Sequence, residues 1–270
     1  MVTTLALTFV FSQQGSTAED KQKFPSTNVL GSAILAGRWE RVKELLAERK
    51  AEKTGLGDGS MASLMDGGYI QADNYYANIL TGIRLYKEAG AGPNEANGKA
   101  LYLAAAGDKH GQIIERLLQY GADPNHRWFY PDSVGIKSGG TPPIGAASST
   151  KNANLLIKYG AKLDVFFVSE SVFDPKFKCN ITPLIQAVLM KNLHSLVPIY
   201  LKARANPNLK CAENGMTALH FAARYNYDDV IPMLLKAKAD KNLKDKNGRT
   251  ALTLARKYKS AKAIKALSEK

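Results

Sequence analysis

The chain has few of the residues from which metal centres are most often built. Its 270 residues include only two cysteines and four histidines. The histidines are scattered, and no cysteine or carboxylate pair has the spacing that places metal ligands on one face of a helix. The sequence therefore predicts no metal site and no cofactor. The four histidines are His110, His126, His194 and His220.

Motifs of catalysis are missing or stand in the wrong order. Ser148 and Lys151 form S-x-x-K, but the partial K-T-G match at Lys137–Gly139 precedes them, whereas penicillin-binding enzymes have the reverse order. The glycine-rich stretch Gly55–Ser60 lacks the flanking strand and helix of a phosphate-binding loop. No nucleophile elbow, general-base pair or zinc motif occurs elsewhere. We therefore expect no catalytic residue and no enzyme activity.

Hydrophobic runs long enough to cross a bilayer are also absent. The apolar stretch Val2–Phe11 is shorter than the ~20 residues that a membrane-spanning helix needs. The small residues Ser16–Ala18 follow it. This order indicates that residues 1–18 are a signal peptide and that the protein is exported to the bacterial periplasm or out of the cell. No Lys or Arg precedes Lys21, so the usual basic leader is missing, and without a signal the protein would be cytoplasmic.

Acidic residues are too few to balance the basic ones. The chain has 24 Asp and Glu against 37 Lys and Arg, a formal net charge of +13. Residues 202–270 alone hold 16 basic and 6 acidic side chains. Such a field attracts acidic partners without identifying them, so nucleic acid, anionic lipid, a cell-wall polymer and an acidic protein all remain open. A lysine-rich surface that only serves solubility is an equal alternative.

What the chain does contain is a short segment repeated at a nearly fixed interval. Four copies begin with threonine, and these threonines lie 41, 35 and 33 residues apart. Internal repeats of this length are typical of stacked architectures, in which each unit buries its apolar face against its neighbours. The copies are TPPIGAA from Thr141, TPLIQAV from Thr182, TALHFAA from Thr217 and TALTLAR from Thr250, with a weaker KALYLAA from Lys99.

A unit of about 33 residues that begins Thr-Pro-Leu-His-x-Ala-Ala resembles the ankyrin repeat. The copy that starts at Thr217 carries this resemblance most strongly. The resemblance implies an all-α ankyrin-repeat solenoid of helix-turn-helix units with short β-hairpin fingers. It also implies a surface that binds other proteins.

The repeats define one elongated domain. We predict a linker over residues 19–27 and six or seven repeats over residues 28–270. Residues 51–96 form a divergent unit with a long loop, and the clearest repeats occupy residues 97–270. The last helix, Ser260–Lys270, alternates apolar residues with lysines, as the terminal unit of a stack requires.

The clearest unit, Asn214–Asn242, shows the roles of single residues. Thr217 is expected to cap the first helix by accepting a backbone N–H bond. His220 is the histidine of the repeat motif and is expected to join neighbouring loops through hydrogen bonds.

Second helices are expected to end in a left-handed residue. Gly121 and Gly160 supply this conformation without steric cost. Arg204 and Lys238 take the same place in later units, at a cost of about 1 kcal/mol each.

Two connections, His126–Gly140 and Val165–Asn180, are longer than the repeat norm and are rich in aromatic residues. Long loops in compact arrays are usually functional or disordered, and aromatic clusters argue against disorder. The resemblance places both as fingers at the edge of the stack, so we predict that they contact the partner. The predicted contacts are His126, Arg127, Trp128, Phe129 and Tyr130 in the first finger and Phe166 and Phe167 in the second.

A second predicted contact surface follows the first helices, which line a groove in proteins of the resembled family. Arg224 and Tyr225 follow FAA in one unit, and Lys257 and Tyr258 follow TLAR in the next. Tyr and Arg are enriched at binding hot spots. Packing of the two tyrosines on adjacent loops is the alternative.

Cys179 and Cys211 lie 32 residues apart, almost one repeat, so they fall at similar places in adjacent units. They could form a disulfide between fingers in an oxidising compartment if their Cα atoms lie within about 7 Å. Two separate thiols are the equal alternative.

These observations favour a non-catalytic, protein-binding module, monomeric when free, whose partner presents an acidic or cleft-bearing face. Our specific hypothesis is an immunity-type inhibitor that masks an envelope enzyme such as a peptidoglycan-cutting peptidase. The alternatives are binding of nucleic acid or an anionic polymer by the basic half, or a secreted effector scaffold. Nucleic acid is the less favoured partner.

Overall fold

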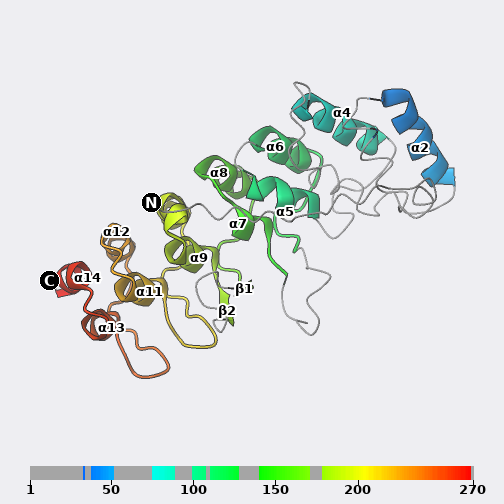
Figure 1. Cartoon of the computed structure of the whole chain (residues 1–270). Coiled ribbons are helices and arrows are strands. Elements are labelled where there is room, and N and C mark those ends of the chain that lie inside the picture. The colour runs from blue at the N-terminus through cyan, green and yellow to red at the C-terminus, as the bar shows by residue number, and fades with distance from the viewer. Residues whose placement is uncertain are drawn as a thin grey trace, which may run out of the picture.

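Helix pairs stacked side by side make up the structure, a computed structural model that describes residues 33, 38–51, 75–88, 99–107, 110–127, 140–170 and 178–268. The first helices of the pairs form one row and the second helices form a parallel row (Figure 1). Each helix contacts its counterpart in the next pair, as in α5 with α7 or α12 with α14. This arrangement is the predicted solenoid.

The first row contains α5 (Lys99–Ala106), α7 (Pro143–Ala146), α9 (Pro183–Leu189), α11 (Ala218–Arg224) and α13 (Ala251–Lys257). The second row contains α4 (Tyr75–Glu88), α6 (Gly111–Gln119), α8 (Thr150–Lys158), α10 (Val197–Lys202), α12 (Val230–Lys236) and α14 (Ala261–Ser268). The helix α2 (Trp39–Ala51) lies beyond α4, and a 3-10 helix, η3 (Lys191–Leu196), leads into α10.

The repeated threonines begin the first helices. The hydroxyl oxygens of Thr182 and Thr250 each accept the backbone N–H three residues on, at 3.3 Å. Thr217 and His220 form a capping box, in which the Thr217 N–H donates to Nδ1 of His220 at 3.2 Å. Each bond satisfies a backbone donor that the first turn of a helix leaves free.

Small side chains allow the first helices to approach one another closely. Alanines at matching places in α5, α9, α11 and α13 are almost completely buried. Larger side chains from the second row, such as Ile113 and Leu234, complete the core. The matching alanines are Ala104, Ala105, Ala187, Ala222, Ala223 and Ala255.

Buried polar groups also join the repeats. The Tyr200 hydroxyl donates to the Ile144 carbonyl at 3.2 Å, and burial raises the pKa of Tyr200 well above its usual value. The amide nitrogen of Asn152, which is completely buried, donates to the carbonyls of Ala105 and Gly107 at 3.1 and 2.8 Å. These bonds join α8 to the end of α5, where both carbonyls also accept a backbone N–H bond.

The predicted left-handed residues are confirmed. Gly121 and Gly160 have φ of 101° and 91°, and Arg204 and Lys238 have φ of 65° and 64°. The same conformation occurs in the turn between the two helices of a repeat. There, Asn226 and Lys259 have φ of 59° and 55°, which the sequence reading did not anticipate.

The second long connection forms the expected hairpin. Strand β1 (Phe167–Glu170) pairs antiparallel with β2 (Lys178–Ile181), with Phe167 opposite Ile181. The prediction that Phe167 contacts a partner is wrong, because its side chain is only 1% exposed. It packs over Gly145 so closely that a Cβ there would lie 2.9 Å from the ring. Phe167 is therefore an anchor of the hairpin to α7.

Several predictions lie outside the described residues: the signal peptide (1–18), the linker (19–27), most of the divergent unit (51–96), and the aromatic residues Trp128, Phe129 and Tyr130. Across the described ranges, no helix is long and apolar enough to cross a membrane.

Candidate functional site

A row of paired residues runs along the ends of the first helices. Thr182, Thr217 and Thr250 fix the register, so Met190, Tyr225 and Tyr258 occupy equivalent places in successive repeats. Each is the residue that directly follows its first helix. Contacts between α9 and α11, and between α11 and α13, bring these places into a line.

Arg224 joins two tyrosines of adjacent repeats. Its guanidinium carbon lies 5.4 Å from the centroid of the Tyr225 ring and 5.0 Å from that of Tyr258, over both rings. The ammonium of Lys257 lies 5.8 Å from the centroid of the same Tyr258 ring. Tyr225 and Tyr258 are nevertheless 41% and 43% exposed. The structure thus brings into contact four residues that the sequence analysis assigned to one surface, and it leaves the two tyrosine rings partly exposed.

Tyr227 extends this group, and the sequence reading did not select it. Its ring stacks on Tyr225 at 5.8 Å between centroids and meets His194 edge-on at 4.6 Å. Burial raises the pKa of Tyr227, as do Tyr225 and Asp229 to a smaller extent. The Tyr-x-Tyr spacing after α11 was a signal for this contact, because the short turn brings both rings to one side. We call Arg224, Tyr225, Tyr227, Lys257 and Tyr258 the Tyr–Arg cluster.

The backbone beneath the cluster is held by hydrogen bonds between repeats. The Arg224 carbonyl accepts from the Ser260 hydroxyl at 3.4 Å, and the Asn226 side-chain oxygen accepts from the Ala263 N–H at 3.1 Å. His220, in α11, bonds the Arg249 carbonyl through Nε2 at 3.0 Å. The expected loop-joining role of His220 is confirmed. These bonds hold the backbone that carries the cluster in place.

The charge around the cluster is positive. Arg256, Lys257 and Lys259 are exposed at the end of α13. Nearby carboxylates are already paired: Asp228 with Lys262 at 3.1 Å, and Asp229 with His194 at 2.8 Å. The hydrogen bond from Lys262 lowers the pKa of Asp228. The surface therefore presents basic side chains that a ligand can reach and few unpaired carboxylates.

The first finger supplies a second group of predicted residues. The Arg127 guanidinium donates to the Phe166 carbonyl at 3.0 Å, which joins the bases of the two long connections. His126, Arg127 and Phe166 are each partly buried. Arg127 thus has a structural contact, and this group is less open than the Tyr–Arg cluster.

Adjacent fingers are linked near the cysteines. Cys211 is 1% exposed and is disulfide-bonded, and the chain contains one other cysteine, Cys179. One residue further along β2, the N–H and side-chain amide of Asn180 donate to the Glu213 carboxylate at 2.8 and 3.1 Å. The two finger bases are therefore fixed to each other.

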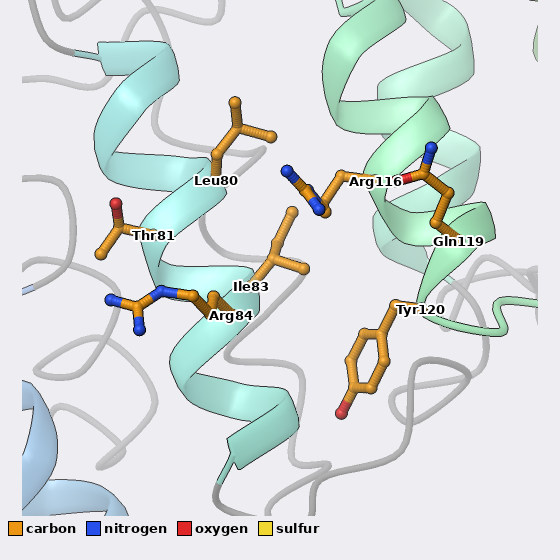
Figure 2. Close-up of a pocket in the computed structure, with 7 residues that line it drawn as sticks. All are labelled: Leu80, Thr81, Ile83, Arg84, Arg116, Gln119 and Tyr120. Atoms are coloured by element: carbon orange, nitrogen blue, oxygen red, sulfur yellow. The ribbon is translucent and has the colours of Figure 1, made fainter.

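The stack also has a hollow of about 360 Å³ between α4 and α6, over the apolar residues Leu80 and Ile83 (Figure 2). Its polar ends do not converge: Arg116 reaches towards α4, whereas Arg84 points away from α6 and pairs with Glu88 at 2.8 Å. Tyr120 also points away from Arg116. The hollow thus lacks the converging acid and base that proton transfer requires.

Within the described ranges, no three His, Cys, Asp or Glu side chains gather where they could hold a metal ion.

Comparison with known families and structures identifies the repeated unit. A family model of three ankyrin repeat copies matches residues 184–270, and a single ankyrin repeat model matches residues 100–128. The fold is similar to the crystal structure of the ankyrin repeat domain of Bcl-3, a unique member of the IkappaB protein family. The TM-score is 0.64 and the identity 22%, over 87% of this chain and 97% of that one. No curated protein sequence matches this chain significantly.

Proposed function

We propose that this chain, which contains ankyrin repeats and folds as an ankyrin-repeat solenoid, binds a partner protein through the Tyr–Arg cluster. Ankyrin repeats form protein–protein interaction modules and are generally non-catalytic. The observation that carries the proposal is the exposure of Tyr225 and Tyr258, at 41% and 43%, both in contact with Arg224.

The energetics of the cluster suit recognition. Tyrosine offers a large contact area with few rotatable bonds, so little conformational entropy is lost when it is covered. Arg224 is already held against two rings, which lowers the entropy cost of ordering its long side chain. Tyr and Arg are the residue types that dominate binding hot spots. Tyr225 and Tyr258 contribute less to the fold, because their side chains are exposed and only Tyr227 of the cluster packs against the core.

The finer proposal is that the partner is an envelope enzyme, such as a peptidoglycan-cutting peptidase, whose cleft is masked by this chain. Two features support an exported protein: the apolar N-terminal segment with its small residues, and the disulfide at Cys211, since disulfides persist in oxidising compartments. Masking needs only a rigid surface that fills a cleft, so no residue of this chain has to act chemically.

The test is capture of envelope proteins on the purified full chain, followed by a peptidoglycan-hydrolysis assay of the captured enzyme. We expect the free chain to inhibit hydrolysis, and the double variant Tyr225→Ala/Tyr258→Ala to lose both capture and inhibition. Tyr159→Ala, directly after α8 in the second row, is the matched control and should keep both. Melting temperatures of all three proteins separate lost binding from lost folding.

Equal capture by the double variant would refute a role for the Tyr–Arg cluster. Capture of a protein with no hydrolase activity would refute the peptidase hypothesis and leave the binding function intact.

Binding of nucleic acid or another polyanion is the second candidate, favoured by the 16 basic residues of positions 202–270. Salt distinguishes the two functions, because affinity for a polyanion falls steeply as counterions compete for it. A protein contact anchored on tyrosines would weaken far less over the same range of salt.

A further inference from the structure

We infer that the partner presents an aspartate or glutamate side chain to Arg224, which binds that carboxylate through the N–H donors of its guanidinium group, beside Tyr225 and Tyr258. The inference rests on the proposed function and names the chemistry that the Tyr–Arg cluster recognises. It differs from a general attraction to acidic surfaces, because it assigns one side chain and one binding geometry.

The geometry of Arg224 limits how a ligand can approach. A guanidinium is planar and carries five N–H donors, all in its plane. The guanidinium carbon of Arg224 is held 5.4 and 5.0 Å from the ring centroids of Tyr225 and Tyr258, and these cation–π contacts do not supply the lone-pair acceptors that its N–H groups can bind. Among the described residues, no acceptor bonds the guanidinium of Arg224, and its side chain is only partly buried. The donors are therefore held in position without a partner.

A carboxylate matches these donors better than other acidic or polar groups of a protein. Its two oxygens accept two parallel N–H bonds from one guanidinium, and such charge-assisted pairs are roughly twice as strong as neutral hydrogen bonds. Lys257, whose ammonium lies 5.8 Å from the centroid of the Tyr258 ring, adds a second cation at this ring. The nearest carboxylates of this chain, Asp228 and Asp229, are paired elsewhere and do not compete for Arg224.

The neighbouring repeat indicates what should flank this carboxylate. Leu189 and Met190 occupy in the α9 unit the places that Arg224 and Tyr225 occupy in the α11 unit. Both are partly buried hydrophobic side chains that pack at the edge of the core. A segment lying along the row would thus place its carboxylate at Arg224 and an apolar side chain over Met190. The expected occupant is a protein segment with an acidic residue close to an apolar one.

A random 12-residue peptide library displayed on phage tests the inference, with the immobilised full chain as bait. We expect the wild type to enrich peptides with Asp or Glu near an apolar residue. Binding of one enriched peptide and of its Asn or Gln counterpart is then measured to the wild type and to Arg224→Gln. The acidic peptide should lose at least about tenfold in affinity to Arg224→Gln, and the amide peptide less than about twofold.

Two further variants sharpen the result. Arg224→Lys keeps the charge but loses the paired donors, so it should recover only a small part of the affinity for the acidic peptide. Arg116→Gln makes the same change of charge on α6 in the second row, and it should bind like the wild type. Circular dichroism melting of each variant shows that the fold is retained.

Three outcomes would overturn the inference. They are enrichment of peptides without acidic residues, equal losses of the acidic and the amide peptide on Arg224→Gln, and enrichment of no peptide at all. In each case the proposed function is tested independently, by the capture experiment with Tyr225→Ala/Tyr258→Ala. Binding of a 20-nucleotide single-stranded DNA that depends on Arg224 and falls steeply with salt would assign the same donors to phosphate, which also contradicts the inference.

Discussion

His220 shows how one residue joins two repeats. Its Nδ1 accepts the Thr217 N–H, so Nε2 carries the proton and donates to the Arg249 carbonyl at 3.0 Å. Both bonds need a neutral imidazole in a single tautomer. Burial lowers the pKa of His220, more than the bond to Arg249 raises it. His220 is therefore neutral, and its hydrogen bonds connect α11 to the finger that precedes α13.

This histidine makes stability depend on pH. Because its pKa is lower in the folded chain, the unfolded chain binds the proton more tightly. The stability that neutral His220 contributes is complete above its unfolded pKa of about 6.5 and is lost as the pH falls below that value. Urea unfolding near neutral pH and about 1.5 units lower should show a larger loss for the wild type than for His220→Gln. Parallel losses in the two proteins would show that His220 is not the titrating group.

Left-handed residues offer a second test at this scale. Lys238 has φ of 64°, where a glycine avoids the steric cost that a side chain carries. Lys238→Gly should raise the free energy of unfolding by about 0.5–1 kcal/mol, measured by urea denaturation. Lys236→Gly, at the last residue of α12, should instead lower it, since glycine destabilises a helix. Changes of the same sign in both variants would contradict the conformational explanation.

Second helices and fingers are connected by a repeated side-chain contact. Asn208 accepts the Asp240 N–H at 2.8 Å and donates to the Lys238 carbonyl at 3.3 Å. Two repeats earlier, Asn125 bonds the Lys162 N–H at 2.8 Å and the Gly160 carbonyl at 3.1 Å in the same way. The asparagines after α6 and α10 thus each fix the corresponding turn of the next unit.

Removing one of these contacts should loosen two neighbouring units. Asn208→Ala loses both bonds, so we expect a decrease of about 1–2 kcal/mol in the free energy of unfolding, measured by urea denaturation. Asn247→Ala, an exposed asparagine of the last finger, is the matched control and should change stability by less than about 0.5 kcal/mol. A similar loss in the control would mean that asparagine acts through its own turn and not between repeats.

The sequence predicted these elements where a local rule decides the structure. Repeated threonines located α9, α11 and α13, and glycine positions located the left-handed turns, since capping and φ depend on nearby residues. Phe167 was misassigned because burial depends on what packs against the strand, here Gly145 of another element. The edge-on ring contact of Tyr227 with His194 was missed for the same reason, because the two residues belong to different units and the sequence does not show how their rings are oriented.

The whole molecule is a linear stack, in which each unit contacts mainly its neighbours. Among the helices and strands that the structure describes, the main contacts join elements of the same unit or of adjacent units, as in α11 with α13 and α12 with α14. Stability in such arrays is approximately a sum of unit terms and nearest-neighbour terms. Damage to one unit should therefore stay close to it.

Hydrogen exchange can measure how far such damage spreads. Leu254 is 1% exposed in α13, and Leu254→Ala should cost about 2–5 kcal/mol of local stability. We expect amide protection to fall in α11–α14 and to remain in α5–α8, read by mass spectrometry of peptic fragments. Loss of protection that is uniform from α5 to α14 would indicate a single cooperative core instead.

The two residues at the end of each first helix are separate from the caps, the alanine contacts and the asparagine bonds that maintain the stack. Exchange of Arg224 and Tyr225 for other side chains would leave those interactions in place. Evolution can therefore alter ligand preference at these sites while the melting temperature stays nearly constant. Homologous chains of equal thermal stability could therefore bind widely different partners, through changes at only two residues in each repeat.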